Sequence, residues 1–83
     1  MMKVWVVRGI HPHVPGEVVE VFATREAADV AACELVNIML KDEGDGKVAT
    51  PQNWRRNVAA LNRRTDGDGD VWVRSYPVKG ATP

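Results

Sequence analysis

The side chains that most often do covalent chemistry in enzymes are scarce in this chain and lie far apart along it. Ser75 is the only serine, Cys33 the only cysteine, and His11 and His13 the only histidines. Ser75 falls inside a predicted strand and the histidines fall in a distant loop, so no hydrolytic triad is expected. A reactive cysteine needs accessible, electropositive surroundings, whereas Cys33 lies in the middle of a predicted helix beside Glu34. We therefore predict no catalytic residue and a protein that is not an enzyme.

Three short motifs resemble ligand-binding loops but do not meet their spacing. The run Gly44–Lys47 lacks the first glycine and the following Ser or Thr of a phosphate-binding loop. The run Asp66–Asp70 has carboxylates at alternate positions, but Pro77 stands where a calcium loop needs glutamate. His11 and His13 are two ligands where a zinc site normally takes four. The sequence predicts no cofactor and no metal site, and leaves open whether the Asp66–Asp70 loop binds a cation.

The strongest binding signal is a group of arginines on the second predicted helix, residues 51–64. The apolar side of that helix is predicted to comprise Trp54, Val58 and Leu61, and Arg56 and Arg63 lie opposite it. Guanidinium groups bind phosphates and carboxylates, but charges on an outer helix face often only solvate it. The zero net charge of the chain also fits nucleic-acid binding poorly. The residues predicted to bind a partner are Trp54, Arg55, Arg56, Arg63 and Arg64.

Charge is unevenly distributed along the chain. Residues 1–46 carry eight acidic and four basic side chains, a net charge of −4, and residues 47–83 carry three acidic and seven basic ones, a net charge of +4. If folding preserves this segregation, two faces of opposite sign result. A second candidate surface, able to mimic nucleic-acid phosphates toward a basic partner, consists of Glu17, Glu20, Asp42, Glu43 and Asp45.

These side chains must be positioned by five predicted elements. Valine-rich runs predict strands over residues 2–8, 17–22 and 70–76. Helical spacing predicts a long helix over residues 27–41, which Thr24 caps, and the pair Thr50-Pro51 is typical of the start of a second helix. The order β-β-α-α-β predicts an α+β fold, a three-stranded sheet packed by one long and one shorter helix. The apolar stripe of the long helix is predicted to comprise Ala28, Ala31, Ala32, Leu35, Ile38 and Met39.

The first predicted strand is apolar on both sides, since Val4 and Val6 alternate with Trp5 and Val7. Such a strand is usually buried on both faces, and the long helix covers one of them. Either the second helix or a partner, including a second copy of this chain, must then cover the other. The aromatic residues predicted to form this interface are Trp5, Trp72 and Tyr76.

Length and composition narrow the class of protein. Eighty-three residues predict one domain, residues 1–79, followed by a loose tail at 80–83. A content of 45% hydrophobic and 27% charged residues argues against disorder. A single cysteine excludes an internal disulfide, which favours a reducing compartment. With no leader, lipidation motif or long apolar run, we expect a cytoplasmic protein that makes no membrane contact.

Two segments also carry a resemblance. Val4–Val7 followed by Val19–Ala28 is similar to small bacteriophage and prophage proteins, in which a Tyr-Val-Val-type strand precedes a Val-Phe-Ser-Thr-type strand end and a Glu-x-Ala helix. The resemblance covers residues 3–41 and 70–79, and the basic helix departs from it. It implies a group that includes inhibitors of bacterial defence systems, among them anti-CRISPR proteins, which act by occupying a surface.

The resulting hypothesis is a non-enzymatic interaction protein of phage or prophage origin that inhibits a host defence complex by occupying a binding surface. Its expected partner is a host protein complex, and self-association into a homodimer is left open. The alternative is a nucleic-acid-binding module that uses the basic helix. Salt dependence separates the two, because phosphate contacts make affinity fall steeply with salt concentration.

Overall fold

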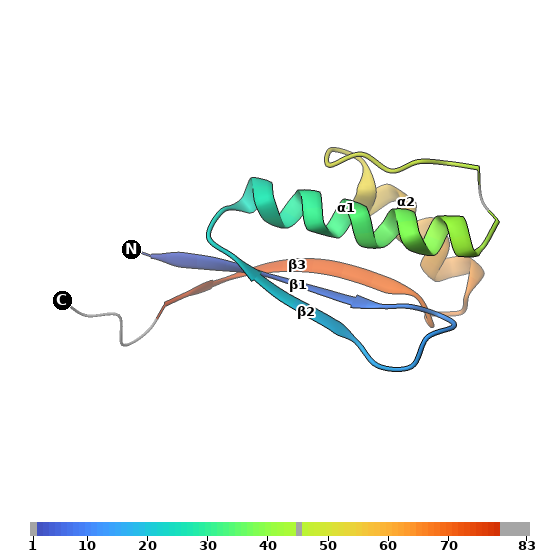
Figure 1. Ribbon diagram of the computed structural model, residues 1–83, viewed down its shortest axis with the longest axis horizontal. Helices are drawn as coiled ribbons and strands as arrows, with labels where there is room; N and C mark the ends of the chain where they lie inside the picture. The colour runs from blue at the N-terminus through green and yellow to red at the C-terminus, as the bar shows by residue number, and fades with distance from the viewer. Residues whose placement is uncertain (1, 45, 79–83) are drawn as a thin grey trace.

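The computed structural model describes residues 2–44 and 46–78. Its elements follow the order β-β-α-α-β, which confirms the predicted α+β fold with one long and one shorter helix (Figure 1). The predicted tail at 80–83 and Asp45 lie outside the described residues. The elements are β1 Lys3–Ile10, β2 Val18–Phe22, α1 Arg25–Asp42, α2 Trp54–Arg64 and β3 Asp70–Pro77.

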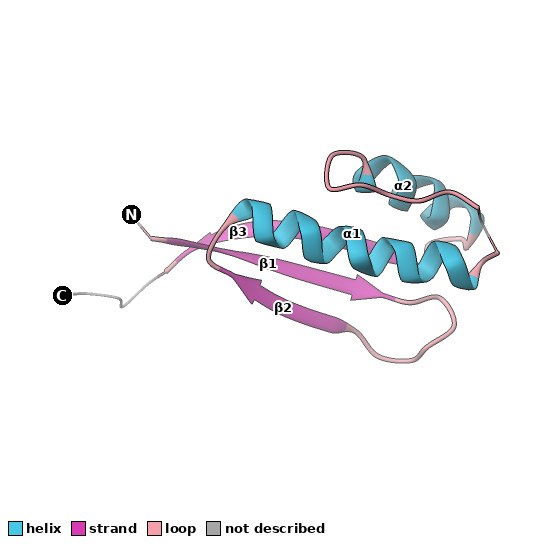
Figure 2. Cartoon of the chain, turned by 45° about the horizontal axis from the view of Figure 1, so that its top comes forward, coloured by secondary structure: helices cyan, strands magenta, loops and turns pink. Residues whose placement is uncertain are grey.

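The sheet has β1 at its centre, paired antiparallel with β2 and with β3. Val7 is level with Glu20 of β2 and with Val73 of β3, and residues level with one another in a sheet point to the same side. Val7 is fully buried, so this side faces the core. Both helices lie on that side (Figure 2). We call it the inner face and the opposite side the outer face.

Gly9 allows β1 to approach α1 closely. A Cβ atom built at Gly9 would lie 3.0 Å from Cδ1 of Leu35, closer than real Cβ contacts normally are. A larger residue would require the Leu35 side chain to shift from its place against the end of β1. The packing of Leu35 at this corner of the sheet therefore depends on the glycine.

Helix α1 begins as predicted. The hydroxyl of Thr24 accepts a hydrogen bond from the backbone N–H of Ala27 at 3.2 Å, and Thr24 has the extended backbone of an N-cap residue. Its last turn carries Lys41, whose charge complements the negative end of the helix dipole. The cap fixes where the chain leaves β2 and turns back over the sheet.

The buried arc of α1 is wider than predicted. Ile38, expected in the apolar stripe, is 53% exposed, whereas Cys33 and Leu40, expected outside it, are buried. The reason is that α1 packs against two neighbours: the sheet on one side and α2 on another. The buried residues of α1 are Ala28, Ala31, Ala32, Cys33, Val36, Met39 and Leu40.

Helix α2 begins three residues later than the predicted start at Pro51. The N–H groups of Asn53 and Trp54 both donate to the carbonyl of Thr50, and the side chain of Asn53 accepts from the N–H of Thr50 at 2.7 Å. These bonds close a separate turn, and α2 starts after it because the backbone of Asn53 (φ −125°, ψ 4°) departs from helical values. The predicted apolar side of the helix is confirmed, since Trp54, Val58 and Leu61 are all buried.

The segment between the helices is attached to α1 by one amide. Oδ1 of Asn37 accepts from the N–H of Ala49 at 2.7 Å, and its Nδ2 donates to the carbonyl of the same residue at 3.2 Å. Ala49 is buried. Without this amide its N–H would lose its partner, while its carbonyl would keep the bond from the Cys33 thiol.

Replacing Asn37 with alanine is expected to lower the free energy of unfolding by about 1–3 kcal/mol, the usual effect of leaving buried polar groups unpaired. Gln52→Ala, an exposed amide, is the matched control and should change stability by less than about 0.5 kcal/mol. Urea unfolding followed by circular dichroism measures both. Equal stability of the two variants would contradict the role of Asn37.

Cys33 is also tied to this segment, because its thiol donates to the carbonyl of Ala49 at 3.2 Å. Burial, and then the nearby negative charge of Glu34, raise the pKa of the Cys33 thiol above 9.0. The folded protein thus keeps a proton that the unfolded chain releases near pH 9. Stability must therefore fall as the pH rises above that value.

We expect the free energy of unfolding to fall more between pH 8 and pH 10 in the native protein than in a Cys33→Ala variant. Denaturant titrations of both proteins across this range measure the difference, and the variant accounts for all other titrating groups. Parallel pH profiles would be evidence against a buried, protonated thiol.

Candidate functional site

Neither α1 nor α2 lies over the outer face of the sheet (Figure 2). The strand register places alternate residues of each strand on this face. Several of its apolar side chains are exposed: Val21 by 61%, Val19 by 51%, Tyr76 by 44% and Ile10 by 43%. The apolar, aromatic and basic residues of the outer face are Val4, Val6, Arg8, Ile10, Val19, Val21, Trp72, Arg74 and Tyr76.

Two arginines lie against the indole ring of Trp72, which is on the edge strand β3 of this face. The guanidinium carbon of Arg74 is 4.4 Å from the ring centroid and that of Arg8 is 5.0 Å from it. Arg8 also forms an ion pair with Glu17 at the start of β2. Each cation–ring contact contributes about 0.5–1 kcal/mol at an exposed site. The ring is therefore held in place while the guanidinium groups remain accessible.

The three aromatic residues predicted as one interface lie on different sides of the sheet. Trp72 and Tyr76 are on the outer face, but Trp5 is level with Phe22 and Ser75 and packs against the core on the inner face. The second helix does not cover the outer face, since α2 lies beside α1. The prediction that the second helix could cover Trp72 and Tyr76 is therefore wrong.

The residues of the predicted basic surface differ in their accessibility. Trp54 is 1% exposed and its indole N–H donates to Oδ1 of Asp29 at 3.2 Å. Arg55 stacks on that ring, with its guanidinium carbon 4.3 Å from the centroid, and lies 3.4 Å from the same carboxylate. Both residues help to hold α2 against α1. The arginines exposed along the rest of α2 are Arg56, Arg63 and Arg64.

The predicted acidic surface is divided among several places. Glu17 is paired with Arg8, and Glu20 points to the inner side of β2. Asp42 and Glu43, at the end of α1, accept hydrogen bonds from the two histidines of the loop between β1 and β2. Glu17, Asp42 and Glu43 thus have partners within the chain, which weakens their use as free phosphate mimics.

Sequence reasoning missed the valines of β2 and the arginines Arg8 and Arg74 as parts of a surface. The available signal was β2 itself, where Val18, Val19 and Val21 occupy both alternating sides of the strand. A two-sided apolar pattern on an edge strand indicates an uncovered face, but only the register shows that Arg8, Trp72 and Arg74 meet there.

No helix within residues 2–44 and 46–78 is long and apolar enough to cross a membrane. In the same described residues, no three His, Cys, Asp or Glu side chains gather closely enough to hold a metal ion. The Asp66–Asp70 run lies in the turn between α2 and β3, where Asp66 and Gly67 have positive φ angles of 53° and 86°.

Comparisons with known proteins give no relative. No protein-family model matches the chain, and neither a curated protein nor a solved structure is significantly similar to it.

Proposed function

We propose that this chain is a non-enzymatic interaction protein whose outer face binds the surface of a partner protein. The observation that carries the proposal is a sheet with both helices on one side and an uncovered array of valines and aromatics on the other. Burial of apolar surface contributes about 25 cal/mol per Å². A contiguous exposed array of this kind is typical of protein interaction sites.

The chemistry of the face favours a partner that presents apolar and acidic side chains. Trp, Tyr and Arg are the residues most enriched among those that dominate binding energy, and Trp72, Arg74 and Tyr76 lie close together on β3. A carboxylate at the centre of the partner surface would pair with Arg8 and Arg74, whose planar guanidinium groups suit that geometry.

The finer proposal concerns the identity of the partner. The resemblance to small phage and prophage proteins supports a host defence complex as the target, which the chain would inhibit in the cytoplasm by occupying a surface. Inhibition by occupying a surface requires neither catalytic residues nor a cofactor in this chain.

The test is capture of partners from nuclease-treated bacterial lysate with the tagged protein and with two variants. Val21→Glu places a charge on the outer face, and Val48→Glu makes the same change at a valine that is 73% exposed between the helices. We expect one stoichiometric partner to be retained by the native protein and by Val48→Glu and to be lost with Val21→Glu. Retention of the partner by Val21→Glu would overturn the proposed surface.

A second candidate function is nucleic-acid binding by α2, which is favoured by the exposed arginines Arg56 and Arg63 two turns apart. Phosphate contacts predict binding to any DNA or RNA, with affinity falling steeply as salt rises. A mobility shift at low salt that Arg56→Glu plus Arg63→Glu removes would support this function. The absence of any shift at low salt would exclude it.

A further inference from the structure

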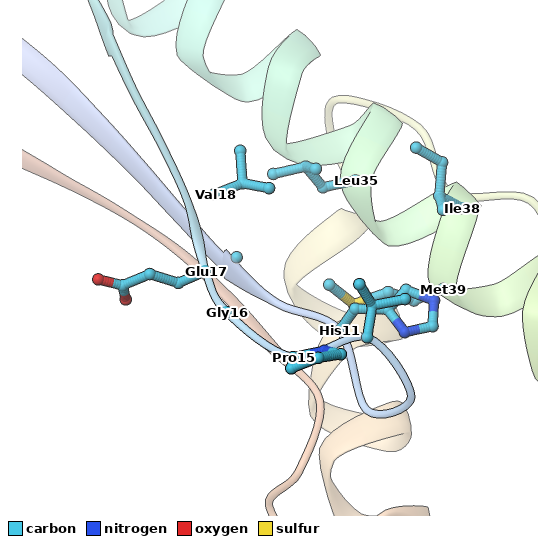
Figure 3. A pocket seen from close by; sticks show the side chains of 10 residues that line it. His11, Pro15, Gly16, Glu17, Val18, Leu35, Ile38 and Met39 are labelled. Atoms are coloured by element: carbon cyan, nitrogen blue, oxygen red, sulfur yellow. The ribbon is translucent and has the colours of Figure 1, made fainter.

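An apolar pocket lies between the start of β2 and the second half of α1, on the inner side of the sheet. Val18 and Leu35 point toward one another across it, while the carboxylate of Glu17 points away (Figure 3). Its volume is about 270 Å³, slightly below the roughly 300–1,000 Å³ of small-molecule sites. A pocket of this size suits one large apolar side chain. The residues that form its apolar lining are Val14, Pro15, Val18, Leu35, Ile38 and Met39.

The loop between β1 and β2 forms one side of the pocket, and two histidines attach this loop to the end of α1. Nε2 of His11 lies 2.6 Å from Asp42 and Nε2 of His13 lies 2.8 Å from Glu43. The backbone N–H of His13 also donates to Nδ1 of His11 at 3.0 Å. This bond leaves Nε2 of His11 as the protonated nitrogen that donates to Asp42. The loop that carries Val14 is thereby fixed to the end of α1, so the pocket is formed before anything binds.

The pocket adjoins the free edge of β2. Among the described residues β2 pairs with β1 alone, and its residues Val18 to Val21 are all exposed. The outer edge of such a strand presents unpaired N–H and C=O groups, onto which an extended peptide can add as a further strand. An extended peptide on this edge would place alternate side chains on the α1 side of the sheet, beside the pocket. We call the pocket together with the adjoining sides of β2 and α1 the groove.

Both walls of this groove carry a carboxylate next to the pocket. On β2, Glu20 follows Val18 by two residues and points to the same side. On α1, exposed Glu34 precedes Ile38 by one turn and lies on the same side of the helix. Helix α1 runs antiparallel to β2 (Figure 1). The step from Val18 to Glu20 therefore leads in the same direction as the step from Ile38 to Glu34, and each step covers about 6–7 Å. That distance matches the spacing of side chains two residues apart in an extended peptide.

We propose that this groove binds an extended segment of a partner protein that pairs with the edge of β2. One apolar side chain of the segment fills the pocket, and a lysine or arginine two residues earlier reaches Glu20 and Glu34. The basic residue precedes the apolar one because a segment that pairs antiparallel to β2 passes Glu20 before it reaches Val18. Antiparallel pairing is the somewhat more stable arrangement of two strands. The site is separate from the outer face and does not depend on the function proposed for that face.

The same charges argue against a second copy of this chain as the occupant, because its β2 contains no lysine or arginine to meet them. In the register with a twofold axis at Glu20, the two Glu20 carboxylates would lie directly opposite each other. Like charges in that position are destabilising. A basic segment instead brings a charge of the opposite sign.

The test is a titration of the isotopically labelled protein with a blocked pentapeptide, Thr-Lys-Thr-Leu-Thr, followed by amide NMR shifts. We expect saturable shifts confined to β2, the β1–β2 loop and the facing side of α1. Affinity should fall at least tenfold when the peptide Leu becomes Ser or the peptide Lys becomes Glu. It should fall similarly for Thr-Thr-Lys-Leu-Thr, in which Lys and Leu are adjacent and point to opposite sides.

Charge exchange tests the two carboxylates directly. The double variant Glu20→Lys plus Glu34→Lys should lose binding to the lysine peptide at least tenfold and should gain binding to Thr-Glu-Thr-Leu-Thr. Glu26→Lys, the same change at an exposed glutamate at the start of α1, should leave both affinities unchanged. Trp72→Ala, on the outer face, should leave them unchanged as well.

Three results would overturn the proposal. The first is the absence of shifts with the lysine peptide up to several millimolar. The second is equal affinity for the peptide with adjacent Lys and Leu, which would show that pairing with β2 does not set the register. The third is a change of the groove shifts on dilution without peptide, which would identify a second copy of the chain as the occupant.

Discussion

Replacing Trp54 with alanine is expected to lower the free energy of unfolding by about 3–5 kcal/mol, the range for removal of a buried aromatic ring. The ring is 1% exposed and belongs to the same buried cluster as Val36 and Leu40 of α1. A chain of this length has a total stability of roughly 4–12 kcal/mol. The substitution therefore removes at least about a quarter of this stability. A chain at the lower end of the range would be largely unfolded by it.

Trp54→Phe separates packing from hydrogen bonding at the same position. It keeps an aromatic ring but loses the indole N–H that donates to Asp29. Asp29 retains Arg25 and Arg55 as ion partners, so its carboxylate is not left alone. We expect a loss of about 1–2 kcal/mol, clearly smaller than the loss for alanine.

Urea unfolding by circular dichroism measures both variants, and the slope of the transition shows what unfolds. If the whole domain unfolds together, the slope is unchanged, because it scales with the surface exposed. A smaller slope together with early loss of helical signal would mean that α2 detaches alone. A loss below about 1 kcal/mol for Trp54→Ala would contradict the place of α2 in the common core.

The order of elements could be predicted because local signals in this chain agree with the fold. Thr24 caps α1 through its hydroxyl, and the spacing of Trp54, Val58 and Leu61 marks the buried side of α2. The start of α2 could not be predicted from Thr50-Pro51. The two residues do not reveal that the backbone of Asn53 departs from helical values and separates their turn from the helix.

The candidate site was harder to predict than the fold. Alternation along β1 places Trp5 opposite Val4 and Val6, but both sets are apolar, so periodicity does not show which set faces the helices. The answer depends on tertiary packing. Leu35 of α1 packs against Gly9, which places Gly9 on the inner face. Trp5 and Val7 lie on the same face because side chains alternate along the strand. Trp72 therefore remains outside, although its sequence neighbourhood resembles that of Trp5.

That difference between two tryptophans yields the largest expected effect on binding. Trp72→Ala removes the ring against which Arg8 and Arg74 lie. Aromatic residues at the centre of an interface typically contribute 2–4 kcal/mol, which is about 30- to 1,000-fold in Kd. We expect the captured partner to bind Trp72→Ala more weakly by a factor in this range.

Trp5→Ala is the matched control, because it makes the same substitution on the neighbouring strand and on the opposite face. Trp5 packs against the core, so its loss should reduce stability more than the loss of Trp72 does. Its affinity for the partner, measured at a temperature where the variant is folded, should stay within about twofold of the native value. Trp72→Ala should thus mainly weaken binding, and Trp5→Ala should mainly reduce stability.

Calorimetric titration of each variant with the partner measures affinity, and urea unfolding of each variant measures stability. Weaker binding by both variants in proportion to their loss of stability would mean that binding follows the fraction folded and not the outer face. Unchanged binding by Trp72→Ala would exclude the Arg8–Trp72–Arg74 group as the contact. Loss of binding in Trp72→Ala alone requires a direct contact with the outer face, since Trp5 and Trp72 share the same sheet and differ in the side they face.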